Sequence, residues 1–315
     1  MTRTVLVTGG SGFIGTWVIR ELLQRGCAVV VFDVAPGGRR WEDLLGESAR
    51  EITFVAGDLL DAKALARVFE EQPISHVIHL AAWLTPDCQR DPYRGCEINV
   101  LGTMRLFELL RAHRERINGF SFASSIAAYG REVDDATAAG AENLLAGEPE
   151  TFYGAFKRAT ESIAKQYWMH FGIPSVALLP TVVYGPGRES GLSASLTLAA
   201  RAVAVGEPYT LNFSGPVGFE FVADTARAFV RAALEVERGC HVADIGGETA
   251  SVEDLIALFE RLRPGAAALL SISGPRLPYA FSAAQSPLTR LFPDWQVTSM
   301  AEGFAQTLAF YETVI

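Results

Sequence analysis

Apolar runs and amphipathic segments alternate along the first part of the chain. Short apolar runs that read as strands cover residues 4–8, 28–33, 52–56, 76–80, 119–123 and 175–179. Between them, apolar residues three and four positions apart predict helices over 13–25, 62–71, 96–114 and 151–171. Strands that are apolar throughout and alternate with helices indicate an α/β fold, with a parallel sheet covered on both faces.

The pattern changes after Pro180. Glycine and proline interrupt residues 180–219, which we expect to be rich in loops, before a helix at 223–237 and a strand at 241–245. Helices are expected at 251–262 and 299–311. The pattern thus predicts a Rossmann-like, doubly wound parallel sheet from residues 1–179 and 220–250. Residues 180–219 and 251–315 are expected to form a smaller, discontinuous substrate-binding lobe.

Composition removes several classes of function. The formal net charge is -9 and there is no lysine-rich tract, so a nucleic-acid partner is not expected. The four cysteines are scattered without a CxxC pair, which favours reduced thiols in a cytoplasmic protein and no metal site. No apolar run is long enough to span a membrane, and the strand at the start of the chain leaves no room for a secretory leader. We therefore expect a cytoplasmic protein that acts on a small molecule.

The strand at 4–8 runs directly into glycines and then into a helix. Gly9, Gly12 and Gly15 follow the pattern GxxGxxG in the stretch TGGSGFIG. A strand, a glycine turn and a helix N-terminus form a phosphate site, because backbone N–H groups and the helix dipole point at the turn. This order predicts a dinucleotide-binding site.

Acidic and small residues after the next strands indicate which parts of a dinucleotide this site would contact. Asp33 ends the second strand, where a carboxylate accepts hydrogen bonds from a ribose 2′-OH and repels a 2′-phosphate. This favours NAD, although the nearby Arg39-Arg40 pair keeps NADP open. Asp58, before Leu59, is a candidate for the adenine amino group or, equally, a helix cap or turn residue. Leu80, Ala81 and Ala82 would let a dinucleotide lie close to the backbone.

Ser125, Tyr153 and Lys157 are the candidate catalytic residues. Ser125 follows the fifth strand, and Tyr153 and Lys157 stand four residues apart, on one face of a helix. An ammonium beside a phenol lowers the pKa of the phenol, which could then take a proton from a substrate hydroxyl. The alternative is a surface pair in which the lysine stem packs on the ring. His79 is expected to make structural hydrogen bonds.

Over nearly its whole length the chain resembles the extended short-chain dehydrogenases/reductases of the NAD-dependent epimerase/dehydratase type. The resemblance rests on TGGSGFIG, Asp33, GDL (57–59), LAA (80–82), NVLGT (99–103), SSIAAYG (124–130), YGAFK (153–157), VVYGPG (182–187), FVAD (221–224) and DIGG (244–247). It implies bound NAD(H) or NADP(H) and the catalytic set Ser125, Tyr153 and Lys157. It further implies a homodimer formed through helices 96–114 and 151–171.

The same resemblance implies additional site residues. The expected cofactor-binding set is Gly9, Gly12, Phe13, Ile14, Gly15, Asp33, Asp58, Leu59, Leu80, Ala81, Ala82, Asn99, Tyr153, Lys157, Pro180 and Val183. The expected substrate-binding set is Trp83, Ser125, Ile126, Tyr153, Thr181 and Phe219. Tyr279 is a further candidate for an apolar pocket lining.

Some positions depart from the family pattern. Nucleotide-sugar enzymes of this type often carry polar residues where this chain has Leu179 and Val182, and an arginine before the FVAD element. Here that stretch reads GPVGFE and contains no arginine. A pyrophosphate requires such donors, so the departures argue against a nucleotide-diphosphate sugar.

These observations leave three hypotheses. The first is an NAD(P)-dependent oxidoreductase acting on a secondary alcohol or carbonyl of a small sugar, sugar acid or similar hydroxylated metabolite. The second is an NAD-dependent sugar or nucleotide-sugar epimerase. The third is a dinucleotide-binding regulator without turnover, against which the intact Ser/Tyr/Lys set argues. A dehydratase is less favoured, because Ile126 and Ala127 replace the acidic residue expected after the serine.

Overall fold

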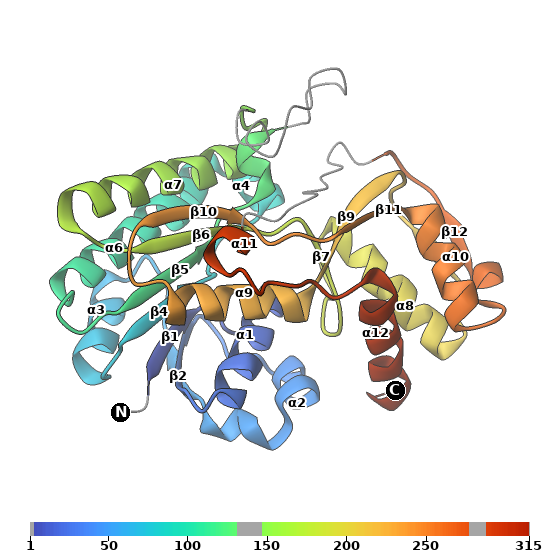
Figure 1. Ribbon diagram of the computed structural model, residues 1–315, viewed down its shortest axis with the longest axis horizontal. Coiled ribbons are helices and arrows are strands. Elements are labelled where there is room, and N and C mark those ends of the chain that lie inside the picture. The colour runs from blue at the N-terminus through green and yellow to red at the C-terminus, as the bar shows by residue number, and fades with distance from the viewer. Residues whose placement is uncertain (1–2, 131–146, 277–287, 315) are drawn as a thin grey trace. The chain divides into compact units, whose positions relative to one another are not determined.

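The computed structural model describes residues 3–130, 147–276 and 288–314 (Figure 1). These residues divide into two compact units. The first unit contains residues 3–130, 147–179 and 226–244, and the second contains 180–225, 245–276 and 288–314. Tyr279 lies outside the described residues.

A seven-stranded parallel sheet forms the centre of the first unit. Its strands are β1 (Thr4–Thr8), β2 (Ala28–Asp33), β3 (Thr53–Ala56), β4 (His76–His79), β5 (Gly119–Ala123), β6 (Ser175–Leu179) and β10 (Cys240–Asp244). The order across the sheet is β10-β6-β5-β4-β1-β2-β3, and every neighbouring pair is parallel. The predicted strands are present, each within one residue of its expected bounds, and the Rossmann-like fold is confirmed.

Helices cover both faces of this sheet. They are α1 (Phe13–Gln24), α2 (Arg39–Leu45), α3 (Ala62–Glu71), α4 (Thr85–Arg90), α5 (Pro92–Cys96), α6 (Gly102–Ala112), α7 (Phe152–Phe171) and α9 (Val222–Glu235). Alternate residues of β5 point to opposite faces. Phe120 and Phe122 pack against Phe107 of α6, whereas the Ser121 hydroxyl donates to the Phe229 carbonyl of α9 at 2.9 Å. The sheet is therefore doubly wound, as its apolar strands predict.

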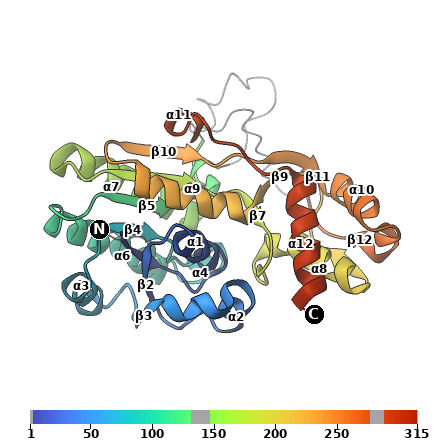
Figure 2. The ribbon, with the colours of Figure 1, turned by 60° about the horizontal axis from the view of Figure 1, so that its bottom comes forward.

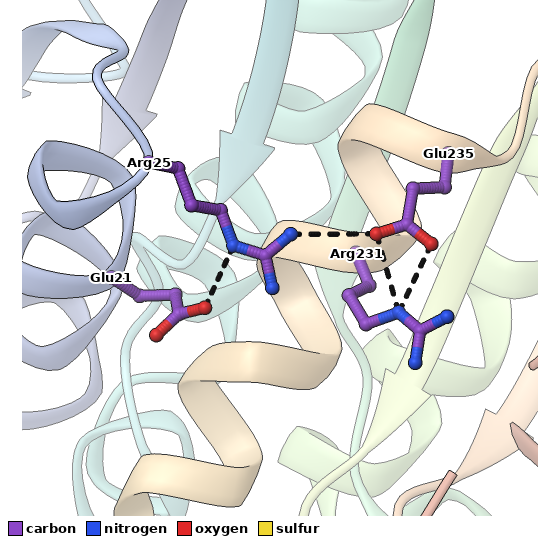
Figure 3. A network of polar contacts seen from close by, with 4 residues as sticks. All are labelled: Glu21, Arg25, Arg231 and Glu235. Carbon is purple, nitrogen blue, oxygen red and sulfur yellow. Dashed lines mark hydrogen bonds and ion pairs between the residues drawn. The ribbon is translucent and has the colours of Figure 1, made fainter. Parts of the chain in front are cut away.

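A network of charged side chains joins α1 to α9 on the surface of the first unit (Figure 3). Arg25 pairs with Glu21 at 2.7 Å and reaches Glu235 at 3.4 Å, and Arg231 holds the other oxygen of Glu235 at 3.0 Å. Partly exposed ion pairs contribute little stability each, so this network adds little to the stability of the unit.

The predicted helix 96–114 differs from the observed one. Helical structure begins earlier, at Pro92 of α5, passes through a π-helical turn at Glu97–Leu101, and ends with α6 at Ala112. The extra residue of a π turn rotates the side chains that follow it, and such turns are frequent at functional sites. Asn99, in this turn, is 2% exposed.

The second unit contains more regular structure than its glycines and prolines predict. Its elements are β7 (Val182–Tyr184), α8 (Ser195–Val205), β8 (Tyr209–Leu211), β9 (Pro216–Phe221), β11 (Glu248–Ser251), α10 (Val252–Leu262), β12 (Leu270–Ile272), α11 (Leu288–Leu291) and α12 (Met300–Val314). Strands β11, β9 and β7 form one sheet, and β12 pairs with β8. Figure 2 shows α12 beside α8. The expectation of a loop-rich segment at 180–219 was therefore wrong. Gly206, with φ 74°, ends α8 rather than marking a loop.

Aromatic residues form the core of the second unit. Tyr184 stacks on Phe304 of α12 with ring centroids 4.0 Å apart, and Phe219 and Phe259 meet Phe304 edge-on. Among the described residues, no helix combines the length and apolar character needed to cross a membrane.

Candidate active site

A cavity of about 460 Å³ lies at the carboxyl ends of β1, β2, β3 and β4. Its lining includes the predicted cofactor residues Gly9, Gly12, Asp33, Asp58, Leu59, Leu80, Ala81 and Ala82, and the predicted substrate residue Trp83. Ligands of open parallel sheets bind at this edge, so the cavity is the candidate nucleotide site.

Two glycines let the turn after β1 pack closely. Gly9 has φ 75°, and a Cβ there would lie 2.6 Å from the amide nitrogen of Ala81. A Cβ on Gly15 would lie 2.2 Å from the Gly9 carbonyl oxygen. Side chains at these positions would push the turn away from β4 and α1. Phe13 and Ile14 open α1 but are not part of the cavity lining.

Asp33 is held at the edge of this cavity by backbone donors. Its two carboxylate oxygens accept from the amides of Ser11, at 3.0 Å, and Val34, at 2.8 Å. The guanidinium of Arg40 donates to the Ser11 carbonyl at 3.0 Å, and exposed Arg39 pairs with Asp43 at 3.3 Å. The carboxylate is thus fixed in place beside the glycine turn, where it would face a ribose.

Asp58 is not the cap of the following helix. Asp61 caps α3 by accepting from Lys63 and Ala64, whereas Asp58 accepts from the amide of Leu60 at 2.9 Å and lines the cavity. The helix-cap role is therefore excluded: Asp58 is a turn residue at the cavity, and its contact with an adenine amino group stays a prediction.

Asn99 does not line the cavity but clamps the backbone of Trp83, which does. Its side-chain oxygen accepts from the Trp83 amide at 2.8 Å, and its amide group donates to the Trp83 carbonyl at 2.9 Å. The same amide group lies 3.4 Å from the Cys88 sulfur. The π-helical turn therefore holds the segment after β4 in position, an indirect role beside the cavity.

The three predicted catalytic residues lie together at the end of β5 and the start of α7. The Lys157 ammonium donates to the Ala123 carbonyl at 2.5 Å and lies 5.6 Å from the centroid of the Tyr153 ring. Ser125 opposes the rise that burial causes in the pKa of the Tyr153 hydroxyl, and it caps the turn Ile126–Tyr129 by accepting from the Ala127 amide at 3.2 Å. Ile126 begins that turn.

Burial has the largest effect on the pKa values of Tyr153 and Lys157. It raises the pKa of Tyr153 to about 12, against the lowering effect of the Ser125 hydrogen bond, and it lowers the pKa of Lys157 to about 8. The sequence predicted a lowered pKa for Tyr153 from the nearby ammonium. The pKa of Tyr153 is raised instead, because removing the phenolate from water costs more than its neighbours return.

Two residues near Tyr153 and Lys157 were not predicted from the sequence. Cys88 of α4 is fully buried against Trp83 and Asn99, and its charge state affects both Tyr153 and Lys157. Glu161, one helical turn after Lys157, accepts hydrogen bonds from Ser124 and Tyr129. The spacing of Tyr153, Lys157 and Glu161 on one helix face was the available signal for Glu161.

Four predicted residues belong to the second unit. These are Pro180, Thr181, Val183 and Phe219. Thr181 donates to Glu220, whose other oxygen accepts from Thr225 at 2.6 Å, so this buried carboxylate is satisfied within the unit. Val183 and Phe219 are buried there.

The described residues contain no group of three or more His, Cys, Asp and Glu side chains arranged to hold a metal ion. All four cysteines are free.

Comparisons with known proteins agree with this geometry. The model of the NAD dependent epimerase/dehydratase family matches residues 5–246. UDP-glucose 4-epimerase of Bos taurus is 27% identical over 316 residues, which cover 89% of this chain and 84% of that protein. UDP-glucose 4-epimerase of Erwinia amylovora is 37% identical over 170 residues, and this match spans about half of each chain, 52% and 48%.

Two solved structures superpose on nearly the whole chain. The UDP-glucose 4-epimerase of Thermus thermophilus, in complex with NAD, superposes with a TM-score of 0.81 at 27% identity, covering 99% of this chain and 100% of that one. MoeE5, in complex with UDP-glucose and NAD, superposes with a TM-score of 0.77 at 26% identity, covering 98% of each chain.

Proposed function

The chain belongs to the NAD-dependent epimerase/dehydratase family, and we propose that its Ser125, Tyr153 and Lys157 oxidise a secondary hydroxyl of a sugar-like substrate reversibly. It is an NAD-dependent enzyme of the extended short-chain dehydrogenase/reductase type. When bound, NAD supplies an acceptor for the hydride that leaves the substrate carbon.

The observation that carries this proposal is the Ser125–Tyr153–Lys157 cluster next to the segment after β4 that lines the nucleotide cavity. Tyr153, reacting as the phenolate, accepts the proton of the substrate hydroxyl and becomes the neutral phenol, while the hydride leaves the same carbon for the nicotinamide, so the C–OH group becomes C=O. Ser125 positions the reacting oxygen, and the Lys157 ammonium stabilises the phenolate that Tyr153 must form. In the reverse direction Tyr153 returns the proton and acts as general acid.

The substrate that we propose is a small sugar, sugar acid or similar hydroxylated metabolite. Leu179 and Val217, at or near the positions of the polar clamps of nucleotide-sugar enzymes, are buried within their own units at 1% and 0% exposure. Glu220 is bonded internally by Thr181 and Thr225. None of these three residues offers a donor to a pyrophosphate.

A second candidate is a nucleotide-sugar epimerase, in which the hydride returns to the opposite face of the oxidised carbon. The similarity to UDP-glucose 4-epimerases along most of the chain favours it. Both candidates share the oxidation step at Tyr153 and differ in whether the oxidised carbon is released as a carbonyl product or reduced again.

We also propose that the active form is a homodimer built through α5, α6 and α7. These helices and the π-helical turn between them carry exposed apolar side chains, among them Tyr93 (77% exposed), Leu101 (43%) and Phe152 (47%). Burying them against a second copy would remove apolar surface from water.

The net reaction is tested by incubating the enzyme with NAD and a panel of polyols, sugars and sugar acids, with UDP-glucose alongside. We expect NADH to accumulate with a member of the small-molecule panel and UDP-glucose to stay unchanged. Conversion of UDP-glucose to its 4-epimer without NADH accumulation would overturn the substrate proposal and establish the second candidate.

A further inference from the structure

A buried carboxylate lies on the side of α7 that carries the candidate catalytic residues. Tyr153, Lys157 and Glu161 follow one another at four-residue spacing, so they share one face of the helix. The Glu161 side chain is 5% exposed. Burial of a carboxylate is costly unless it is bonded, so its partners indicate what it does.

Both oxygens of Glu161 accept hydrogen bonds from the segment that follows β5. One accepts from the hydroxyl of Ser124, the neighbour of Ser125, and the other from the hydroxyl of Tyr129. Burial raises the pKa of this carboxyl, and the hydrogen bonds of Ser124 and Tyr129 act against that rise by favouring the ionised form. Glu161 thus ties both ends of the turn that begins at Ser125 to α7.

Arg158 completes the contacts of this carboxylate. Its guanidinium lies 3.8 Å from a Glu161 oxygen and 4.4 Å from the centroid of the Tyr129 ring. Arg158 also lines a depression of about 700 Å³ between α7 and the edge strand β10, and Glu161 and Tyr129 are part of the same lining.

We propose that Glu161 is a positioning residue of the candidate active site: it holds the turn that bears Ser125 against α7, and its carboxylate, four residues after Lys157 on the same helix face, adds to the negative charge near that ammonium. The inference rests on the proposed function, because it assigns a task to Glu161 only if Tyr153 and Lys157 act as described there.

The electrostatic part of this role follows from the balance at Lys157. Burial lowers the pKa of Lys157 to about 8, and the charges of Cys88 and Glu161 act in the opposite direction. Burial raises the pKa of Glu161, whereas Ser124, Tyr129, Arg158 and Lys157 oppose that rise. Removing the negative charge of Glu161 would lower the pKa of Lys157 further, so less ammonium would remain above neutral pH.

Other charged and titratable groups face Glu161 and also influence how activity depends on pH. They are Lys157, Arg158 and Lys165 of α7, Tyr129 after β5, and Cys240 and His241 of β10. All of them are retained when Glu161 alone is changed.

The test is the pH profile of kcat for Glu161→Gln, which keeps the size of the side chain and removes its charge. We expect the limb on which activity falls at high pH to move down by about one pH unit. Glu161→Asp, which restores the charge, should return the limb toward the wild-type position. A uniform loss of activity with an unmoved limb would show a merely structural role and overturn the inference.

Glu108→Gln is the matched control. Glu108 of α6 also accepts from a tyrosine, Tyr167 at 2.6 Å, and pairs with an arginine, Arg111 at 2.5 Å, but it is exposed. This variant should leave the limb unmoved. If Glu161→Gln does not fold, the same pH profile of kcat is measured for Ser124→Ala instead. It removes one donor to the carboxylate and should shift the limb in the same direction by less, and an unmoved limb overturns the inference.

Tyr153→Phe, measured in parallel, separates the two claims. If Tyr153→Phe keeps full turnover, the proposed function fails whatever Glu161 does. If Tyr153→Phe is inactive and the Glu161→Gln limb is unmoved, only the inference about Glu161 fails.

Discussion

Two backbone N–H groups hold the Asp33 carboxylate beside the glycine turn, and we propose that this arrangement favours NAD over NADP. The amides of Ser11 and Val34 fix both oxygens, so the charge cannot turn away from a ribose that lies over the turn. A 2′-phosphate at that place would meet a fixed negative charge. Arg40 donates to the carbonyl of Ser11 nearby.

Asp33→Asn should therefore weaken NAD binding and reduce the discrimination against NADP. Losing a charge-assisted hydrogen bond of this kind costs roughly 1.5–3 kcal/mol, or about tenfold to hundredfold in Kd. Titration of both cofactors against the variant, followed by calorimetry, measures the change. Glu42→Gln, at an exposed position of α2, is the control for net charge. An unchanged ratio of the two dissociation constants in Asp33→Asn would refute this role.

For single residues, the sequence predicted those whose position follows from their neighbours along the chain. The glycine turn, Asp33 and the Tyr153–Lys157 pair each follow from a strand end or a helix spacing. Cys88 and Ser124 could not be found in this way, because their contacts depend on how separate elements rotate against one another. Asn99 was predicted to bind the cofactor; it does not line the cavity, and its side chain is bound to the Trp83 backbone.

Between elements, His79 connects β1, β4 and α6 in the interior of the first unit. Its Nδ1 lies 2.6 Å from the Thr8 hydroxyl, and its Nε2 lies 3.0 Å from the Thr103 hydroxyl. Thr103 gives its own proton to the Asn99 carbonyl at 2.7 Å, so Nε2 must carry the proton that Thr103 accepts. The ring is neutral in this arrangement, which agrees with the structural role expected from the sequence.

Burial lowers the pKa of His79 to about 3, which makes the fold sensitive to acid. Between the unfolded pKa of about 6.5 and the folded value, the unfolded chain binds the additional proton. Stability is therefore complete above about pH 6.5 and is lost as the pH falls, by about 2 kcal/mol between roughly pH 7 and pH 5.

His79→Gln should reduce that dependence, since glutamine keeps an acceptor and a donor but does not titrate. Urea unfolding near neutral pH and about two pH units below it gives the two free energies, with exposed His170→Gln as the control. Buried His76, whose pKa burial lowers to about 4, leaves a residual dependence in the variant. Equal acid sensitivity of His79→Gln and the wild type would contradict the assignment.

Element boundaries were predictable where apolar runs are continuous and less so where glycine and proline occur. Strands β1, β2, β5 and β6 have the expected bounds, since a buried parallel strand is apolar throughout. In the second unit glycine and proline end α8 and flank β9, although the same residue types predict loops. The π-helical turn at Asn99 has no signal in the sequence period, and its Asn99 side chain bonds a segment distant along the chain, at Trp83.

For the whole molecule, the proposed association of two copies through α5, α6 and α7 can be tested by introducing a single charged side chain. Leu101→Glu would place a carboxylate in the proposed interface, and we expect mass measurement by light scattering to show monomer at concentrations where the wild type is dimeric. Met169→Glu, in the depression between α7 and β10 and 62% exposed, should stay dimeric. Dimers formed equally by both variants, or a monomeric wild type, would exclude this interface.

The central claim is that Tyr153 takes the proton while hydride leaves the substrate carbon. The most direct measurement is a single turnover of the NAD-bound enzyme with its substrate, following the NADH absorbance band in wild type and in Tyr153→Phe. We predict that the variant still binds NAD and reduces it roughly 100- to 10,000-fold more slowly, since a general base contributes that much to a rate. Reduction of NAD at the wild-type rate in Tyr153→Phe would contradict the account.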